Sequence, residues 1–134
     1  MMKWIGSAAV CIQGNRLLMV QQGKKDEPKL WTVPSGGKEI DESFESCCLR
    51  ELEEETGYKG EIIRPLHVKN GHSYGYEVTV HYFLVRIVGG QAKIQDPDNL
   101  IHEIRWVKSD EINSLELAFP QDLSHLQELM FIES

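Results

Sequence analysis

The stretch Gly36–Tyr58, GGKEIDESFESCCLRELEEETGY, decides the predicted fold. It opens on a glycine-rich turn, and every residue from Ser43 to Thr56 tolerates a helix. Ser43 is a suitable N-cap residue, and Gly57 suits the left-handed conformation that follows a helix end. The sequence therefore predicts a central helix over 43–56.

Glutamates crowd the last turn of this predicted helix, where Glu53, Glu54 and Glu55 follow one another. The carbonyl end of a helix dipole favours cations and disfavours carboxylates. At about 100° per residue, three acidic side chains lie on the same side of the helix as its apolar residues, and they are Glu51, Glu54 and Glu55. Glu53 faces the other way.

A solvated surface is the ordinary explanation for a run of glutamates. Here the helical periodicity argues against it, because unpaired carboxylates on the apolar side cost several kcal/mol of a total stability of about 5–15 kcal/mol. Arg50, on the neighbouring flank, is expected to neutralise only one of them. The sequence therefore predicts bound Mg²⁺ or Mn²⁺, ions that prefer oxygen ligands and keep waters that a phosphate can replace.

This stretch resembles the complete signature of the Nudix hydrolases, the MutT-like family. Nine positions at fixed spacing carry the resemblance: Gly36, Glu42, Arg50, Glu51, Leu52, Glu54, Glu55, Gly57 and Tyr58. The resemblance implies an enzyme, a metal-dependent pyrophosphohydrolase that cleaves a nucleoside diphosphate linked to another group.

The resemblance also implies roles for single residues. Glu51, Glu54 and Glu55 would bind the metal, and one of them is a candidate to orient the attacking water. The backbone carbonyl of Gly36 would add a metal ligand. Two further residues, Arg50 and Glu42, would hold the glutamates in place.

An acidic residue outside the signature is expected to assist catalysis, and Glu103 is the candidate because it lies near the start of a predicted strand. A plain surface position is the equal alternative for it. Trp31 and Tyr74 are candidates to stack on a nucleobase, since one precedes the glycine turn and the other lies in a glycine-containing loop. Burial in the core is the alternative for these aromatic residues.

Strand-like segments surround the helix. A hairpin is predicted from 4–12 and 16–21 around Gly14-Asn15, and further strands are predicted over 30–33, 61–68, 76–88 and 101–107. Residues 35–37 read as a flexible turn. Leu123, Leu126, Leu129 and Met130 recur at helical spacing near the C-terminus. One helix on each face of a mixed sheet gives an α/β/α sandwich of Nudix type, and the 134 residues fit one domain, 1–134.

Composition excludes several functions. The 21 acidic and 14 basic residues give a net charge of −7 without a basic stripe, so binding to duplex nucleic acid is not expected. No run approaches the roughly 18 apolar residues of a membrane span, and we identify no export signal, so a cytoplasmic location is expected. The three cysteines have no CxxC spacing and are expected to be reduced thiols.

The predicted substrate is a small nucleotide with a diphosphate linkage. A nucleoside triphosphate, cleaved to the monophosphate and pyrophosphate, is favoured because 134 residues leave little sequence for a sugar pocket. ADP-ribose or a nucleotide sugar is the alternative, and the protein is expected to be a monomer or a homodimer. Two other readings are a nucleotide-sensing module without catalysis and a protein-binding module that uses Leu123, Leu126 and Met130.

Overall fold

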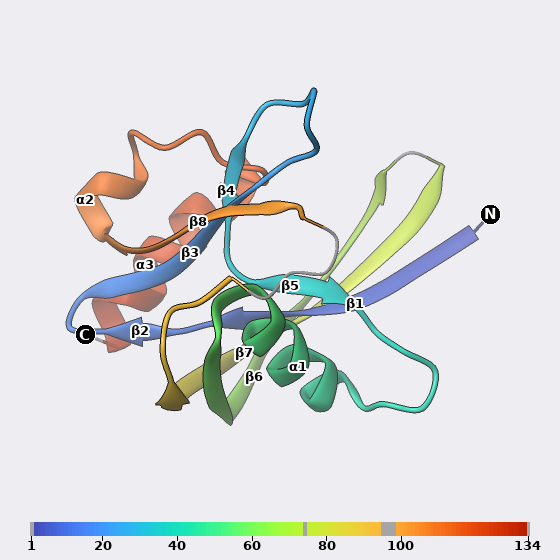
Figure 1. Cartoon of the computed structure of the whole chain (residues 1–134), viewed down its shortest axis with the longest axis horizontal. Helices are drawn as coiled ribbons and strands as arrows, with labels where there is room; N and C mark the ends of the chain where they lie inside the picture. The colour runs from blue at the N-terminus through green and yellow to red at the C-terminus, as the bar shows by residue number, and fades with distance from the viewer. Residues whose placement is uncertain (1, 74, 95–98, 134) are drawn as a thin grey trace.

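The computed structural model describes residues 2–73, 75–94 and 99–133 (Figure 1). In chain order the elements are β1 (Met2–Val10), β2 (Ile12–Gln13), β3 (Arg16–Gln22), β4 (Leu30–Thr32), β5 (Ser35–Gly37), α1 (Phe44–Thr56), β6 (Tyr58–Ser73), β7 (Tyr76–Gly90), β8 (Ile101–Lys108), α2 (Ser109–Ile112), the 3₁₀ helix η1 (Pro120–Asp122) and α3 (Leu123–Glu133). None of the helices in these ranges is long and apolar enough to cross a membrane.

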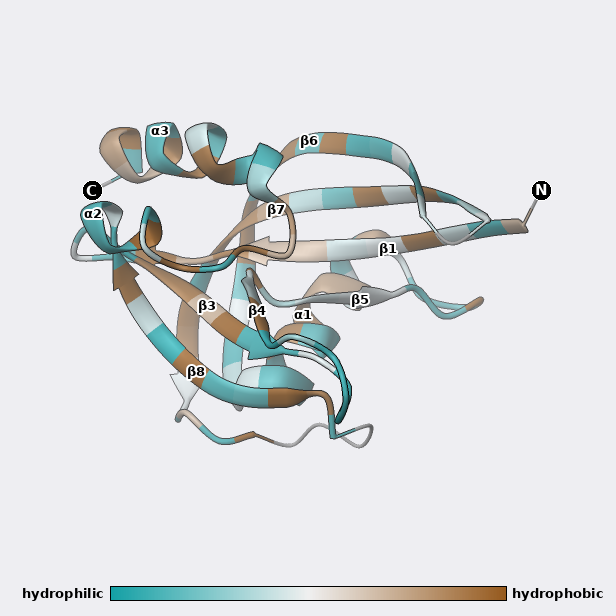
Figure 2. Ribbon diagram, turned by 90° about the horizontal axis from the view of Figure 1, so that it is seen from above, coloured by the Kyte–Doolittle hydropathy of each residue, from teal (hydrophilic) through white to brown (hydrophobic). Residues whose placement is uncertain are grey.

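The strands form two sheets between two helices. The first sheet has the order β5-β1-β7-β6, in which β1 and β7 are parallel and the other pairs are antiparallel. The second has the order β2-β3-β4, with β8 paired to β3. Figure 2 shows α3 on one side of the strands and α1 on the other. This arrangement confirms the predicted α/β/α sandwich with a mixed sheet.

Alternation along the strands divides the core into two clusters, because successive strand side chains point to opposite faces. On the α3 side, Ala8 and Val10 of β1 pack in one cluster with Leu126 and Met130 of α3. On the α1 side, the smaller cluster consists of Ala9, Cys11, Leu18, Cys48, Leu52, Phe83 and Val85. Both faces of β1 are therefore buried over its second half.

The predicted central helix is confirmed at both ends. The Ser46 backbone N–H donates to Ser43 Oγ at 3.0 Å, which caps the first turn. Gly57 has φ 81°, and its N–H donates to the Glu53 carbonyl at 2.8 Å. A glycine fits there because a side chain strains this left-handed conformation.

The predicted hairpin of 4–12 with 16–21 is wrong for most of its length. Only β2 and β3 form it, around Gly14 and Asn15, whose φ values of 53° and 62° match a tight hairpin turn with two left-handed residues. β1 pairs instead with β7 and β5 in the other sheet. Short-range patterns cannot identify a partner that lies some 70 residues away in the sequence.

The predicted turn at 35–37 is also wrong, because these residues form strand β5, antiparallel to β1 with Gly6 opposite Gly37. Glycine is needed at these positions because neighbouring groups approach the backbone closely, and not because the segment is flexible. A Cβ on Gly36 would fall on the Glu51 carboxyl group, and a Cβ on Gly6 would collide with the Gly36 carbonyl oxygen. The first residues of the signature are therefore held in β5, an edge strand of the first sheet.

The predicted strand over 61–68 is part of a longer one. β6 runs from Tyr58 to Ser73 and absorbs Pro65 through irregular register on both sides of it. The predicted strands over 76–88 and 101–107 are confirmed as β7 and β8.

The C-terminal helix is confirmed as α3, and its apolar stripe belongs to the core. Leu126 and Met130 are 4% and 0% exposed, and Leu123 packs against the same cluster. The reading of this stripe as a partner-docking surface is therefore wrong.

Candidate active site

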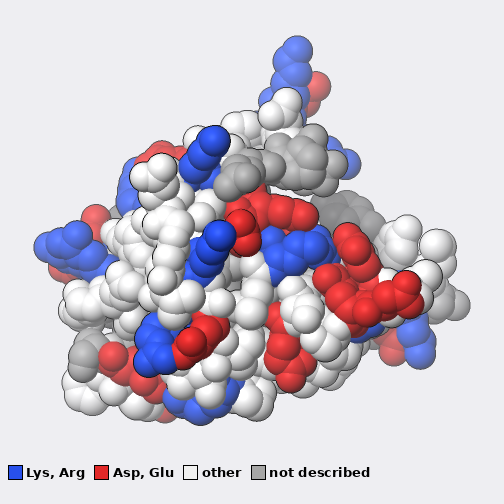
Figure 3. Space-filling view, turned by 60° about the horizontal axis from the view of Figure 1, so that its bottom comes forward, with Lys and Arg blue, Asp and Glu red and all other residues white. Residues whose placement is uncertain are grey.

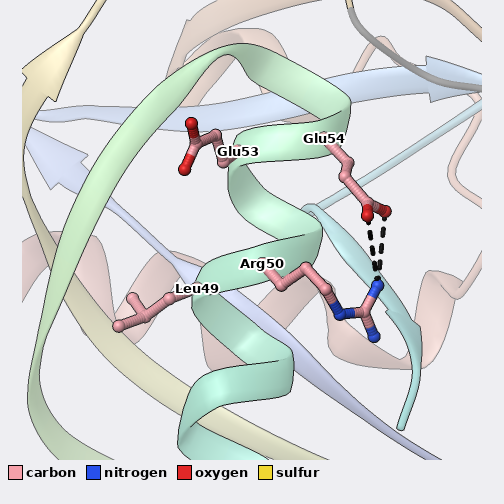
Figure 4. A pocket seen from close by; sticks show the side chains of 4 residues that line it. All are labelled: Leu49, Arg50, Glu53 and Glu54. Carbon is pink, nitrogen blue, oxygen red and sulfur yellow. Dashed lines mark hydrogen bonds and ion pairs between the residues drawn. The ribbon is translucent and has the colours of Figure 1, made fainter. Parts of the chain in front are cut away.

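Arg50 is the centre of the candidate site. Its Nε and Nη2 donate to the two carboxylate oxygens of Glu42 at 2.9 and 2.5 Å, and Nη2 also donates to the Gly37 carbonyl at 2.9 Å. Nη1 donates to Glu51 Oε1 at 2.8 Å and lies 3.3 Å from Glu54 Oε2 (Figure 4). The guanidinium contacts two of the helix glutamates and Glu42 as well, so three carboxylates share its single positive charge.

Glu42 is the most strongly held carboxylate. The Arg50 guanidinium lowers the pKa of Glu42 from 4.5 to about 2, and the Glu39 backbone N–H adds a hydrogen bond of 2.9 Å. The fork-to-carboxylate contact with Arg50 also fixes the loop between β5 and α1. These contacts support the predicted role of Glu42, which is to hold the glutamates of α1 in place.

We expect Glu42→Gln to change how the free energy of unfolding depends on pH. A carboxyl whose pKa is lower in the folded state stabilises the protein above about pH 4.5, and this contribution is lost as the pH falls toward about 2. Wild type should therefore lose its advantage over Glu42→Gln across that window, as measured by urea unfolding without metal. The exposed Glu53→Gln variant serves as control, and a constant difference between wild type and Glu42→Gln at all pH values would contradict the pairing.

Glu51 is partly buried, with its side chain 14% exposed. Burial raises the pKa of Glu51, and hydrogen bonds with Glu55 and Arg50 oppose this effect only in part. Negative charge on Glu51 is therefore unfavourable in this partly buried position unless a cation is near it.

Glu54 and Glu55 lie in different environments. The Glu54 side chain is 39% exposed and borders an open hollow of about 350 Å³ lined by Leu49, Arg50, Glu53 and Glu54 (Figure 4). Glu55 is buried at 6% exposure, and its Oε1 accepts the Ser35 backbone N–H at 3.3 Å. Glu53 is exposed, as its position on the helix predicted.

The carboxylates are close but are not arranged as ligands. Within residues 2–73, 75–94 and 99–133, no three acidic, His or Cys side chains stand at metal-binding positions. Arg50 Nη1 lies between Glu51 and Glu54 and takes the place that a cation between them would need. The donor set nevertheless fits a hard ion, since Glu42, Glu51 and Glu54 share one guanidinium and α1, described throughout, has no basic residue in its last turn. The face that carries α1 shows acidic side chains gathered around basic ones (Figure 3).

The Gly36 carbonyl faces a thiol. Cys47 Sγ donates to it at 3.6 Å. A metal ligand at Gly36 would have to replace or share this contact, so that role stays a prediction.

Glu103 lies on β8 and pairs with Arg105 at 2.7 Å. Arg105 in turn covers the ring of Trp31, with its guanidinium carbon 4.7 Å from the ring centroid. Trp31 is 5% exposed and belongs to the core cluster on the α3 side. Its predicted stacking on a base would therefore require Arg105 to move, and Tyr74 lies outside the described residues.

Two backbone groups of the site were missed by the sequence analysis. The Gly37 carbonyl accepts from Arg50, and the Ser35 N–H donates to Glu55. Main-chain groups leave no side-chain pattern in a sequence, so only the strand β5 shows that they face the helix.

Comparisons with known proteins concern the family and the fold of the chain. A family model described as the NUDIX domain matches residues 3–129. A Mycobacterium tuberculosis protein that carries the name mutator protein MutT4 is 34% identical over 91 residues, which are 63% of this chain and 35% of that protein. A Bacillus subtilis protein named as an 8-oxo-dGTP diphosphatase is 32% identical over 95 residues, which are 71% of this chain and 59% of that protein. The chain thus spans about a third of the first relative and under two thirds of the second.

Solved structures share the fold. A NUDIX hydrolase from Nitrosomonas europaea superposes with a TM-score of 0.84 at 21% identity, over 98% of this chain and 89% of that one. An ADP-ribose pyrophosphatase from Streptococcus suis superposes with a TM-score of 0.74 at 22% identity, over 96% of this chain and 92% of that one. At these identities the likeness concerns the fold.

Proposed function

The chain belongs to the Nudix hydrolase family, and from this premise we propose that it hydrolyses the diphosphate linkage of a small nucleotide with the help of Mg²⁺ or Mn²⁺. One observation carries the proposal. Four carboxyl groups lie within ion-pair distance of the single guanidinium of Arg50, from Glu39, Glu42, Glu51 and Glu54, and Glu55 adds another in the last turn of α1. This excess of negative charge is unfavourable unless a cation joins it.

The predicted metal-binding residues keep their roles in the proposal. Glu51, Glu54 and Glu55 would hold the ion, and the Gly36 carbonyl is a further candidate ligand. The ion would supply charge neutralisation at the phosphates and a water of lowered pKa. Such a site needs oxygen donors that a phosphate can approach from solvent, and the Glu54 side chain is 39% exposed.

Residues of the chain itself hold the site in position and accept the proton. Arg50 and Glu42 fix the loop and the helix relative to each other through paired hydrogen bonds. Glu54 or Glu55 accepts the proton of the attacking water. Glu54 is the better placed of the two, because its side chain is partly exposed and can contact solvent. Glu103 remains a proposed assisting acid, which must first leave its pair with Arg105.

The proposed substrate is a nucleoside triphosphate cleaved to a monophosphate and pyrophosphate. The name of the B. subtilis relative, an 8-oxo-dGTP diphosphatase, supports this choice, whereas the name of the S. suis enzyme supports ADP-ribose as the second candidate. We propose that residues 1–134 act as one domain on a small molecule, as a monomer or a homodimer. The cytoplasmic location stays a prediction.

A phosphate-release screen tests the proposed function. The panel contains nucleoside triphosphates, nucleotide sugars, dinucleoside polyphosphates and ADP-ribose, each with and without Mg²⁺. We expect metal-dependent release from a nucleoside triphosphate, and in ¹⁸O-labelled water the label should appear on phosphorus. Faster cleavage of ADP-ribose than of every triphosphate would overturn the substrate choice, and inactivity on the whole panel would favour a sensing module.

We expect Mg²⁺ or Mn²⁺ to raise the melting temperature, since an ion that binds only the folded state stabilises it by mass action. The shift should vanish in the Glu51→Ala, Glu54→Ala double variant and persist in Glu53→Ala, whose side chain is exposed on the same helix. Differential scanning calorimetry at millimolar metal measures both. Calcium should bind but support little hydrolysis, because its looser geometry positions water and phosphate less well. An unshifted wild-type melting curve with all three ions would exclude the metal site.

A further inference from the structure

The indole of Trp4 is the exposed aromatic surface nearest to the glycine strand of the candidate site. Its ring packs beside the Gly6–Gly37 pair: a Cβ on Gly6 would stand 2.6 Å from Trp4 Cη2, and a Cβ on Gly37 would stand 3.4 Å from Trp4 Nε1. The side chains that these two glycines lack would otherwise fill the place of the ring. The indole is thus supported by the backbone of these two glycines, and the residue keeps 37% exposure.

Apolar neighbours extend this surface on the same face of the sheet. Strand register places Val78 beside Trp4 and Tyr76 beside Met2, and alternation puts all four on the α3 side with Ala8 and Val10. Tyr76 and Met2 are 37% and 65% exposed. We call this surface, formed by Met2, Trp4, Tyr76 and Val78, the Trp4 platform. It lies on the part of β1 and β7 that extends beyond the helices toward the N-terminus (Figure 2).

The other two tryptophans are less exposed than Trp4. Trp31 is buried and covered by Arg105, and Trp106 donates its indole N–H to the Tyr58 hydroxyl at 3.2 Å. All three tryptophans of the chain are within the described residues, and Trp4 is the exposed one.

The Trp4 platform and the carboxylates lie on opposite faces of β5. Successive residues of this strand point to opposite faces, so Gly37 faces Trp4 and Gly36 faces the Glu51 carboxyl group. β5 contains three residues and lies at the edge of its sheet. A single short strand therefore separates the exposed ring from the proposed phosphate site.

We infer that Trp4 stacks on the base of the nucleotide whose diphosphate lies at Glu51, Glu54 and Glu55, with the nucleotide passing around the edge of β5. This inference rests on the proposed function for the phosphate end and assigns the base end to a residue outside the signature. A planar heteroaromatic ring suits the platform because base–aromatic stacking needs only two π faces and tolerates any base. Trp4 is thus a binding residue, and it takes no part in proton transfer.

Binding measurements test the inference without requiring turnover. In Trp4→Ala, and in Trp4→Leu, which keeps an apolar cover on Gly6 and Gly37, the Kd of GMP with Mg²⁺ should rise about tenfold or more by calorimetry. Trp4→Phe should recover most of the affinity. The Kd of ribose 5-phosphate, which has the phosphate but no base, should not change in any of these variants. Phe131→Ala, which removes an aromatic ring that is 84% exposed on α3, is the matched control and should bind GMP like wild type.

Kinetics with the best nucleoside triphosphate separate binding from chemistry. We expect Trp4→Leu to raise KM about tenfold and to leave kcat within about threefold. An unchanged GMP affinity in both Trp4→Ala and Trp4→Leu, or an equal loss of affinity for ribose 5-phosphate, would overturn the inference. A wild-type protein that binds GMP through Trp4 but cleaves no substrate would instead overturn the proposed function and leave the base site standing.

Discussion

Replacing Glu54 or Glu55 by glutamine is expected to lower turnover by at least about a hundredfold while leaving the fold intact, as for the loss of a key acid–base or electrostatic group. Glutamine keeps the size of the side chain and one carbonyl oxygen, which can still accept the Ser35 N–H at Glu55 or the Arg50 contact at Glu54. It removes the negative charge that a metal ion and a transferred proton both require. The measurement is kcat at saturating Mg²⁺ with the best substrate of the phosphate-release screen.

The same variants should not destabilise the metal-free protein. Each removes one of the carboxylates that repel each other at the carbonyl end of α1, so the melting temperature should stay equal or rise. Glu53→Gln, on the exposed side of the same turn, should keep both its turnover and its stability. Wild-type turnover in Glu54→Gln or in Glu55→Gln would remove that glutamate from the mechanism.

Local chemistry is what the sequence analysis predicted well. The bounds of α1 follow from the Ser43 cap and the left-handed Gly57, and both act within one turn of the helix. The exposure of Glu53 and the burial of Glu55 follow from helical periodicity alone. These features need no information from distant parts of the chain.

The pairing of strands that lie far apart in the sequence was not predicted. Ser35–Gly37 contains the residues of a turn, and it becomes a strand because β1 supplies hydrogen-bond partners and α1 supplies the Glu51 carboxyl that only a glycine admits. β1 leaves the predicted hairpin because β7 and β5 pair with its two edges, while the clusters on the α3 and α1 sides bury its two faces. Trp4 escaped notice for the same reason, since its support comes from Gly37 of another strand.

The sequence predicted that the site carries an excess of negative charge, but it did not predict which carboxylates Arg50 contacts. The excess of carboxylates was visible in the sequence, whereas the reach of one guanidinium to three of them depends on the loop that brings Glu42 back to α1. Arginine can make such contacts because its fork presents five N–H donors in a fixed plane. Arg50 is therefore the residue whose removal should disturb the site most.

Arg50→Ala is expected to lower both stability and activity. Without the guanidinium, Glu42 and Glu51 remain partly buried and unpaired, which should cost about 2–3 kcal/mol of the free energy of unfolding. This is below the roughly 3–5 kcal/mol for a fully buried pair because 26% of the Arg50 side chain is exposed. Activity should fall about tenfold to a hundredfold, the scale for losing a group that orients metal ligands.

The pH dependence of this loss identifies its cause. Repulsion among the carboxylates requires that they are ionised, so the stability difference between wild type and Arg50→Ala should be largest near pH 7 and should shrink as the pH falls below about 4.5. Arg50→Lys keeps the charge but presents no planar fork, so it should recover part of the stability and little of the activity. Urea unfolding across this pH range and kcat/KM at saturating Mg²⁺ measure the two effects. A stability loss that is independent of pH would mean that Arg50 acts by packing, and full activity in Arg50→Lys would mean that its charge alone is sufficient.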